Sequence, residues 1–197
     1  MFIAFEGGDG AGKTTQIELL RAQLVDAGYD VVVTREPGGT ALGTSIREVL
    51  LHGDDVAPRA EALLFAADRA QHIATVVRPA LARGAVVLQD RYLDSSVAYQ
   101  GAGRALNPGE IRALSLWATE DLLPDLTVLL DVTPEIGRAR RGDVHDRLES
   151  EEDDFHARVR EHYLQLAAAD PSRYLVVDAS LPAEEIAAIV SERVGRP

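Results

Sequence analysis

Eight consecutive residues near the N-terminus have the types and the spacing that bind phosphate. Residues 7–14 follow the pattern G-x-x-x-x-G-K-[ST] and stand between an apolar run and a helical pattern. In such a loop the glycines let backbone N–H groups turn inward around phosphate oxygens, and the positive end of the following helix adds to the attraction. A glycine-rich turn without a ligand is the alternative. We expect nucleotide phosphates to lie along Gly7, Gly8, Asp9, Gly10, Ala11, Gly12, Lys13, Thr14 and Thr15.

Lys13 and two oxygen-bearing side chains complete this candidate site. Of the 20 basic residues 19 are arginine, so the single lysine puts a slim ammonium where a planar guanidinium would fit poorly. Lys13 is expected to reach the β- and γ-phosphates, and the Thr14 hydroxyl to bind Mg²⁺. Asp90 ends an apolar run and is predicted to hold the same Mg²⁺ or its waters. Taken alone, Asp90 is equally well explained as an ordinary strand end.

Two later segments indicate what else is bound. A guanine-reading Asn-Lys-x-Asp motif is excluded, because Lys13 is the only lysine. The charged turn 34–40 follows the second apolar run, at the edge of an open sheet where ligands bind. Phe65 and Arg69 are four residues apart on a helical pattern, so the ring can stack on a base while the guanidinium donates to its carbonyl. Ordinary core packing is the alternative for Phe65.

The elements that must position these groups alternate along the chain. Short β-branched runs between turn signals predict strands, and apolar residues at helical spacing lie between them. Asn107, followed by Pro108 and by Glu110, predicts a helix start. This alternation predicts one α/β domain over residues 1–197, a five-stranded parallel sheet with helices on both faces. The expected strands are Phe2–Glu6, Asp30–Thr34, Ala85–Asp90, Leu126–Asp131 and Tyr174–Asp178.

Composition limits the classes of partner. A formal charge of -12 argues against a nucleic-acid-binding surface, and no apolar run approaches the roughly 20 residues that span a bilayer. The first six residues lack the basic region of a signal peptide and the chain has no cysteine, so a cytoplasmic location is expected. The five histidines show no paired ligand spacing. Any metal is therefore expected to arrive with the nucleotide.

The whole set of motifs resembles the thymidylate kinase family of P-loop nucleoside-monophosphate kinases. The phosphate loop, the turn 35–40, the segment 65–72, the triplet 90–92 and the segment 95–101 occur in the family's order. The resemblance implies a P-loop fold, a homodimer, and transfer of the γ-phosphoryl group of ATP to dTMP, giving ADP and dTDP for dTTP synthesis. It also implies that Phe65 stacks on thymine, Arg69 donates to a thymine carbonyl, Ser96 and Gln100 lie near the base, and Tyr99 lies against the deoxyribose. Pro37 is assigned to the same substrate site.

The arginines imply how transfer is assisted. By resemblance, Arg91 lies between donor and acceptor phosphates and Arg35 approaches the acceptor phosphate. A polar stretch, about 138–149, resembles the short lid that closes over ATP, and Arg141 and Arg147 are our choices for the cation it delivers, although a solvated helix face explains each as well. Asp9 stands in the loop where eukaryotic members carry an arginine, which resembles the bacterial pattern. It would face the acceptor nucleotide.

Two other readings remain open at this point. The first is another nucleoside-monophosphate or nucleoside kinase, acting for example on dUMP or on a 5′-hydroxyl. The second is a non-catalytic ATP-binding regulatory module. The acceptor-side residues argue against the second, since a sensor of ATP has no need of them.

Overall fold

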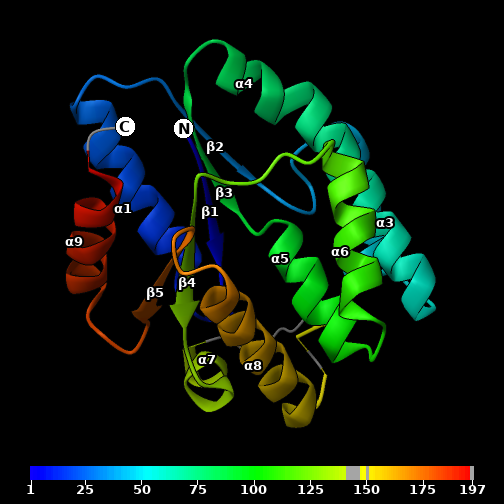
Figure 1. Cartoon of the computed structure of the whole chain (residues 1–197). Helices are drawn as coiled ribbons and strands as arrows, with labels where there is room; N and C mark the ends of the chain where they lie inside the picture. The colour runs from blue at the N-terminus through cyan, green and yellow to red at the C-terminus, as the bar shows by residue number, and fades with distance from the viewer. Residues whose placement is uncertain (141–146, 150, 196–197) are drawn as a thin grey trace.

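The computed structural model describes residues 1–140, 147–149 and 151–195. Over these residues the chain forms a five-stranded parallel sheet in the order β2-β3-β1-β4-β5, with helices on both faces (Figure 1). The strands are β1 (Phe2–Glu6), β2 (Val31–Arg35), β3 (Val86–Asp90), β4 (Leu126–Asp131) and β5 (Tyr174–Asp178). The predicted parallel α/β sheet is confirmed, and the expected strands are reproduced to within one residue.

The helices begin and end as follows. They are α1 (Lys13–Asp26), α2 (Ala41–Arg47), α3 (Pro58–His72), α4 (Arg78–Ala82), α5 (Leu93–Ser96), α6 (Pro108–Thr119), α7 (Pro134–Arg140), α8 (Asp153–Ala169) and α9 (Ala183–Val194). Three π-helical segments extend α2, α3 and α5: η1 (Glu48–His52), η2 (Ile73–Val77) and η3 (Val97–Gly103). The start predicted at Asn107 is confirmed, because its side chain accepts from Gly109 N at 2.8 Å and from Glu110 N at 3.4 Å.

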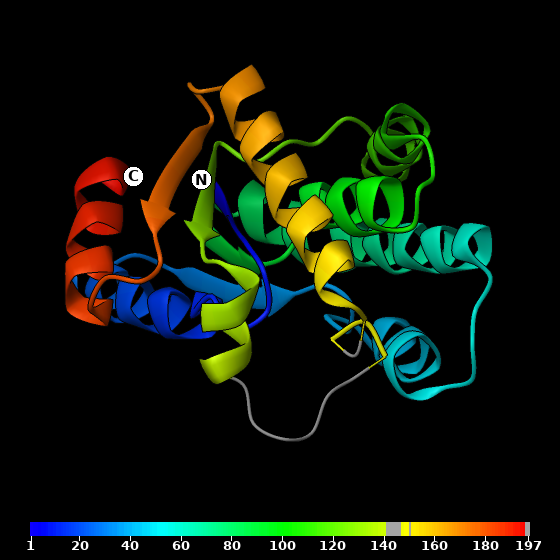
Figure 2. The same ribbon diagram turned by 90° about the horizontal axis from the view of Figure 1, so that it is seen from below.

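Alternation along β1 divides the core between the two faces of the sheet. Ile3 and Phe5 pack with apolar residues of α1 and α9, whereas Phe2 and Ala4 pack with residues of α3, α6 and η2. Figure 2 shows the sheet between these two layers, with α8 crossing the side opposite α1. None of the helices within the described residues is long and apolar enough to cross a membrane.

The carboxyl ends of three neighbouring strands meet at one edge. Arg35 is aligned with Asp90 across β2 and β3, and Phe5 is aligned with Asp90 across β1 and β3. Parallel pairing therefore places the phosphate loop after β1, the turn after β2 and the end of β3 side by side, as expected for an open α/β sheet.

Candidate active site

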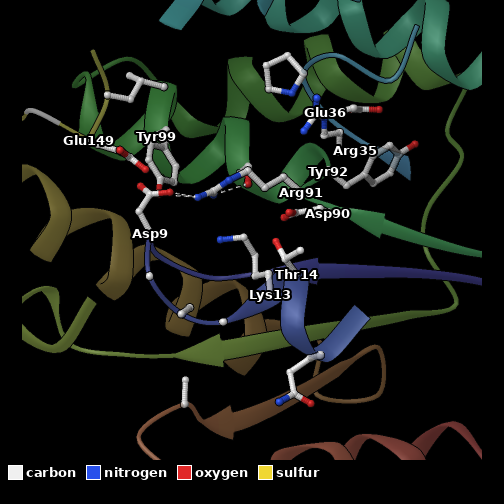
Figure 3. Close-up of a pocket in the computed structure, with 18 of the residues that line it drawn as sticks. Asp9, Lys13, Thr14, Arg35, Glu36, Asp90, Arg91, Tyr92, Tyr99 and Glu149 are labelled. Carbon is white, nitrogen blue, oxygen red and sulfur yellow. Dashed lines mark hydrogen bonds and ion pairs between the residues drawn. The ribbon is translucent and has the colours of Figure 1, made fainter. Parts of the chain in front are cut away.

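A cavity of about 700 Å³ opens at this edge of the sheet. The phosphate loop and α1 form one wall, and the turn after β2 together with α3, α5 and η3 forms the other. Figure 3 shows Lys13 and Thr14 facing Asp90 and Arg91 across the floor of this cavity. One continuous space thus joins a phosphate-binding loop to a second, side-chain-lined pocket.

The phosphate loop has the backbone that its glycines allow. Gly7, Gly10 and Gly12 have φ angles of 135°, 78° and 90°, a region that favours glycine. A Cβ at Gly7 would also collide with the carbonyl oxygen of Leu130, so two requirements meet at that position. A substituted Gly7 would therefore displace β4 or open the loop.

Lys13 lies across this loop, and its side chain is almost wholly buried. Its Nζ donates to the carbonyl oxygens of Gly7 at 3.2 Å and Gly8 at 3.1 Å. Burial lowers the pKa of Lys13 and the Arg91 guanidinium lowers it further, while Asp90 and nearby carboxylates act in the opposite direction. The ammonium is thus held where phosphate oxygens would compete for it with two carbonyl groups.

The oxygen atoms around Asp90 fit a divalent cation or its waters. Asp90 Oδ1 is buried and has no hydrogen-bond partner among the described residues, although a buried polar atom normally has one. Thr14 lines the same cavity, and Figure 3 shows its hydroxyl side facing Asp90. Oxygen ligands of this kind suit Mg²⁺. No group of three His, Cys, Asp or Glu that could hold a metal occurs among the described residues, so these two side chains would share a metal with phosphate oxygens.

Arg91 stands where the two halves of the cavity meet. It follows β3 with a φ of 63°, a conformation that costs energy for a residue with a Cβ, and its backbone N–H is held by Phe5 O at 2.9 Å. Its guanidinium binds Asp9, donates to Ser95 Oγ at 3.2 Å and to Tyr99 Oη at 3.3 Å, and lies 5.0 Å from the centre of the Tyr99 ring. Burial acts to lower the pKa of Arg91, but Tyr99 and Asp9 outweigh it and keep the guanidinium charged.

Asp9 is held on the acceptor side of this junction. Tyr99 Oη donates to Asp9 Oδ2 at 2.9 Å, and Arg91 binds the other oxygen of the carboxylate. The phosphate loop is thereby joined to η3 through side chains 90 residues apart in the chain. That Asp9 faces the acceptor nucleotide stays a prediction.

The second half of the cavity is lined by one face of α3 and by η3. Phe65 is 8% exposed; it lines the cavity and also belongs to a core cluster, so packing and ligand contact are both available to it. Arg69 is 1% exposed and donates to Glu36 Oε2 at 2.7 Å and to Ser96 Oγ at 3.2 Å. Arg69 therefore enters the pocket already fixed, with its charge balanced by Glu36.

A buried polar network lies behind the turn that follows β2. Glu36 Oε1 and His72 Nδ1 are 2.8 Å apart, and His72 Nε2 lies 2.6 Å from Thr34 Oγ1. Asp68 accepts from Gly38 N at 3.1 Å, and burial, with a further contribution from Glu36, raises its pKa to about 6. This network fixes the turn that brings Arg35 and Pro37 to the cavity.

The structure brings most of the predicted residues together. Those that line the cavity are Asp9, Gly10, Ala11, Gly12, Lys13, Thr14, Thr15, Arg35, Pro37, Phe65, Arg69, Asp90, Arg91, Ser96, Tyr99 and Gln100. Gly7 and Gly8 lie beside it, in contact with Lys13. Within the expected lid, Arg140 lines the cavity, while residues 141–146, and Arg141 with them, lie outside the described residues.

Arg147 lies apart from this set. Its Nε donates to Leu50 O at 2.9 Å and its Nη2 binds Glu61. Its backbone N–H donates to Leu51 O at 3.2 Å, which fixes the C-terminal part of the expected lid to η1. Delivery of a cation to phosphate by Arg147 stays a prediction, and in this structure the guanidinium is held by a carboxylate.

The sequence analysis did not predict three buried glutamates, Glu6, Glu36 and Glu61. Glu6 accepts from Tyr92 N at 2.8 Å and from Tyr163 Oη at 2.9 Å, and Glu36 and Glu61 hold arginines. One signal was present: Glu61 is four residues before Phe65 and eight before Arg69, on the same helical face. A carboxylate in register with two predicted ligand-binding side chains indicates a buried, functional position.

The chain is similar to known proteins over nearly its whole length. A model of the thymidylate kinase family matches residues 5–190. The chain belongs to this family. It is 65% identical to the thymidylate kinase of Clavibacter michiganensis subsp. michiganensis (strain NCPPB 382), over 98% of this chain and 93% of that one. It is 60% identical to that of Bifidobacterium longum (strain NCC 2705), over 98% and 96% of the two chains.

A solved structure extends the likeness to three dimensions. The crystal structure of thymidylate kinase from Ehrlichia chaffeensis superposes with a TM-score of 0.83 at 32% identity, over 98% of this chain and 97% of that one. The predicted family and the P-loop fold are therefore confirmed. The roles of the individual site residues stay predictions.

Proposed function

We propose that this protein transfers the γ-phosphoryl group of ATP to dTMP, giving ADP and dTDP. The observation that carries the proposal is the continuous cavity, in which the phosphate loop and a side-chain-lined pocket meet at Arg91. Phosphoryl transfer asks a protein mainly to position two anions and to neutralise the charge that develops between them. Lys13 on the donor side, Arg35 on the acceptor side and Arg91 between them supply the cations for this task.

Each side of the cavity has its own part in the reaction. The loop N–H groups and Lys13 bind the β- and γ-phosphates of ATP, while Arg140 and the segment 179–186 border the donor side, where adenine would lie. On the acceptor side Phe65 stacks on thymine, Arg69 and Ser96 contact its polar edge, and Tyr99 excludes a 2′-hydroxyl. Mg²⁺, held through Thr14 and Asp90, neutralises the phosphate charge when it is bound.

A homodimer and a cytoplasmic location complete the proposal. Leu63 on α3 and Trp117 on α6 are 58% and 80% exposed, and a second copy of the chain would cover such side chains favourably. Size-exclusion chromatography with light scattering measures the mass. A monomer over the working concentration range would contradict the dimer without touching the proposed reaction.

A coupled ADP-release assay tests the reaction. ATP and Mg²⁺ are supplied with dTMP, dUMP, dCMP, dGMP, AMP or no acceptor, and Lys13→Ala serves as the inactive control. We expect turnover that strongly prefers dTMP. Preference for another acceptor would overturn the base pocket, and release of ADP without an acceptor would indicate an ATPase or a regulatory ATP sensor.

A further inference from the structure

Glu61 is a buried carboxylate just outside the lining of the cavity. It is 0% exposed and lies on α3, one turn before Phe65. Its Oε1 accepts from Gln100 Nε2 at 2.9 Å and from Arg104 Nε at 3.3 Å, and its Oε2 accepts from Arg104 Nη2 at 3.4 Å and from Arg147. One carboxylate therefore joins α3 to η3 and to Arg147 in the C-terminal part of the expected lid.

The charges in this cluster are arranged so that Glu61 can only accept. Arg104 and Arg147 are 17% and 15% exposed at their side chains, and Arg104 also pairs with Glu151. Both oxygens of Glu61 accept from guanidinium groups, which have donors and no acceptor. A hydrogen bond from Gln100 to Glu61 must then come from the amide nitrogen of Gln100.

This contact decides which end of the Gln100 amide faces the ligand. Gln100 lines the cavity and is 1% exposed, so its side chain has little freedom to turn. With Nε2 on Glu61, the carbonyl Oε1 is left for the cavity. Throughout residues 1–140, 147–149 and 151–195, no donor forms a hydrogen bond with that oxygen.

We propose that Glu61 is a positioning residue for base selection, which fixes Gln100 so that an acceptor faces the pyrimidine N3. The proposal rests on the function proposed above. Thymine and uracil carry a hydrogen at N3 and can donate to Gln100, whereas N3 of cytosine carries a lone pair that would meet another acceptor. A site built to bind a substrate N–H discriminates strongly against an analogue that lacks it, because its own polar atom stays unpaired.

The substitution Glu61→Gln tests this hydrogen bond, because it should reverse the orientation of the Gln100 side-chain amide. The new side chain keeps one acceptor, and the guanidiniums of Arg104 and Arg147 compete for it more strongly than a neutral amide does. Its NH₂ group is then left facing Gln100, whose own amide must turn its oxygen toward residue 61 and its nitrogen toward the cavity. Arg69 still opposes the cytosine amino group, so the main effect is a loss with dTMP.

The measurement is kcat/KM for dTMP, dUMP and dCMP with wild type, Glu61→Gln and the exposed control Glu192→Gln. We expect the ratio of dTMP to dCMP to fall about 10- to 100-fold in Glu61→Gln and to stay unchanged in Glu192→Gln. A purely structural role would lower both substrates alike, so a folded Glu61→Gln enzyme with the wild-type ratio would overturn the proposal. Thermal unfolding of each variant verifies that it is folded.

A second variant covers the case in which Glu61→Gln does not fold. Glu61→Asp keeps the charge between the arginines but withdraws the carboxylate from Gln100 by one methylene, so the amide is released. The dTMP to dCMP ratio is expected to fall here too, and an unchanged ratio contradicts the inference. If wild type itself does not turn over dTMP, the proposed function fails and this inference fails with it; a failure confined to the ratio overturns this inference alone.

Discussion

The two halves of the cavity bind their ligands by different means. On the donor side, the phosphate loop offers backbone N–H groups of consecutive residues 7–14, and its geometry comes from glycines with positive φ. On the acceptor side, the wall is made of side chains from β2, α3, α5 and η3, and several of them are held by partners distant in sequence. Glu36 and Arg69 are 33 residues apart, and Asp9 and Arg91 are 82 apart.

This difference predicts different sensitivities to mutation. A backbone site depends on few side chains, and loss of its lysine removes binding of the transferring group without unfolding the chain. A side-chain site depends on buried polar pairs, so removing one member leaves its partner unsatisfied and disturbs specificity and stability together. The following substitutions are ordered from the largest expected effect to the smallest.

Lys13→Ala removes the cation of the donor side. Within the part of the chain that the structure describes, Lys13 donates to carbonyl oxygens of the loop and forms no ion pair, so its loss breaks no buried salt bridge there. We expect turnover to fall below detection in the ADP-release assay while the thermal unfolding midpoint changes little. Near-normal turnover would contradict the phosphate-loop assignment.

Arg91→Ala removes the cation at the junction. An arginine that stabilises a transferring phosphoryl group contributes about 10³ to 10⁵ in kcat, or roughly 4 to 7 kcal/mol of barrier. Arg91→Gly is the matched control, because it removes the same side chain and also relieves the positive φ. Equal losses of kcat in the two variants assign the effect to the guanidinium; a much milder loss in the glycine variant would assign it to the backbone.

Phe65→Ala separates stacking from core packing on the acceptor side. Base stacking on an aromatic side chain is worth about 1 to 3 kcal/mol, so the KM for dTMP should rise about 10- to 100-fold before kcat falls. Phe65→Leu keeps most of the buried volume, and it should raise KM with a stability loss below about 1.5 kcal/mol. An unchanged KM in both variants would make Phe65 a core residue alone.

Glu6→Gln removes the charge of a buried carboxylate that joins the donor and acceptor halves of the cavity. Glu6 ends β1 just before the phosphate loop, and it accepts from Tyr92 N, Ser95 N and Ser95 Oγ on the acceptor side. Burial, together with the neighbouring charge of Asp94, raises the pKa of Glu6 from 4.5 to about 7. The folded state therefore binds this proton more tightly than the unfolded state does between these values.

Because of this raised pKa, the free energy of unfolding of wild type depends on pH. Wild type loses stability as pH rises from about 4.5 to about 7, by an amount on the order of 1 to 3 kcal/mol, because the folded state must give up a proton that it favours. The neutral amide of Glu6→Gln avoids this loss. Urea unfolding at pH 5.5 and pH 8 should show the variant gaining stability relative to wild type at the higher pH. Parallel curves for the two proteins would exclude the raised pKa.

Sequence reasoning located the strands and many of the residues that line the cavity, but not the buried carboxylates behind them. The phosphate loop, Asp90 and the helix start at Asn107 are written in local patterns, and the structure reproduces their positions. Glu6, Glu36 and Glu61 carry no such local pattern, since a single glutamate at a strand end or on a helix is usually exposed. Arg147 was assigned to phosphate from its place in the expected lid, and only the fold shows that it pairs with Glu61.

By itself the sequence determined which residues can bind phosphate, which runs form strands and which family pattern the chain follows. These properties depend on contacts between near neighbours: glycine conformations, the period of apolar residues and helix capping. Tertiary structure decided the direction of the Arg91 and Gln100 side chains and the ionisation of Glu6. Those properties depend on burial and on charges brought together across the sheet, which exist only once distant segments have packed against one another.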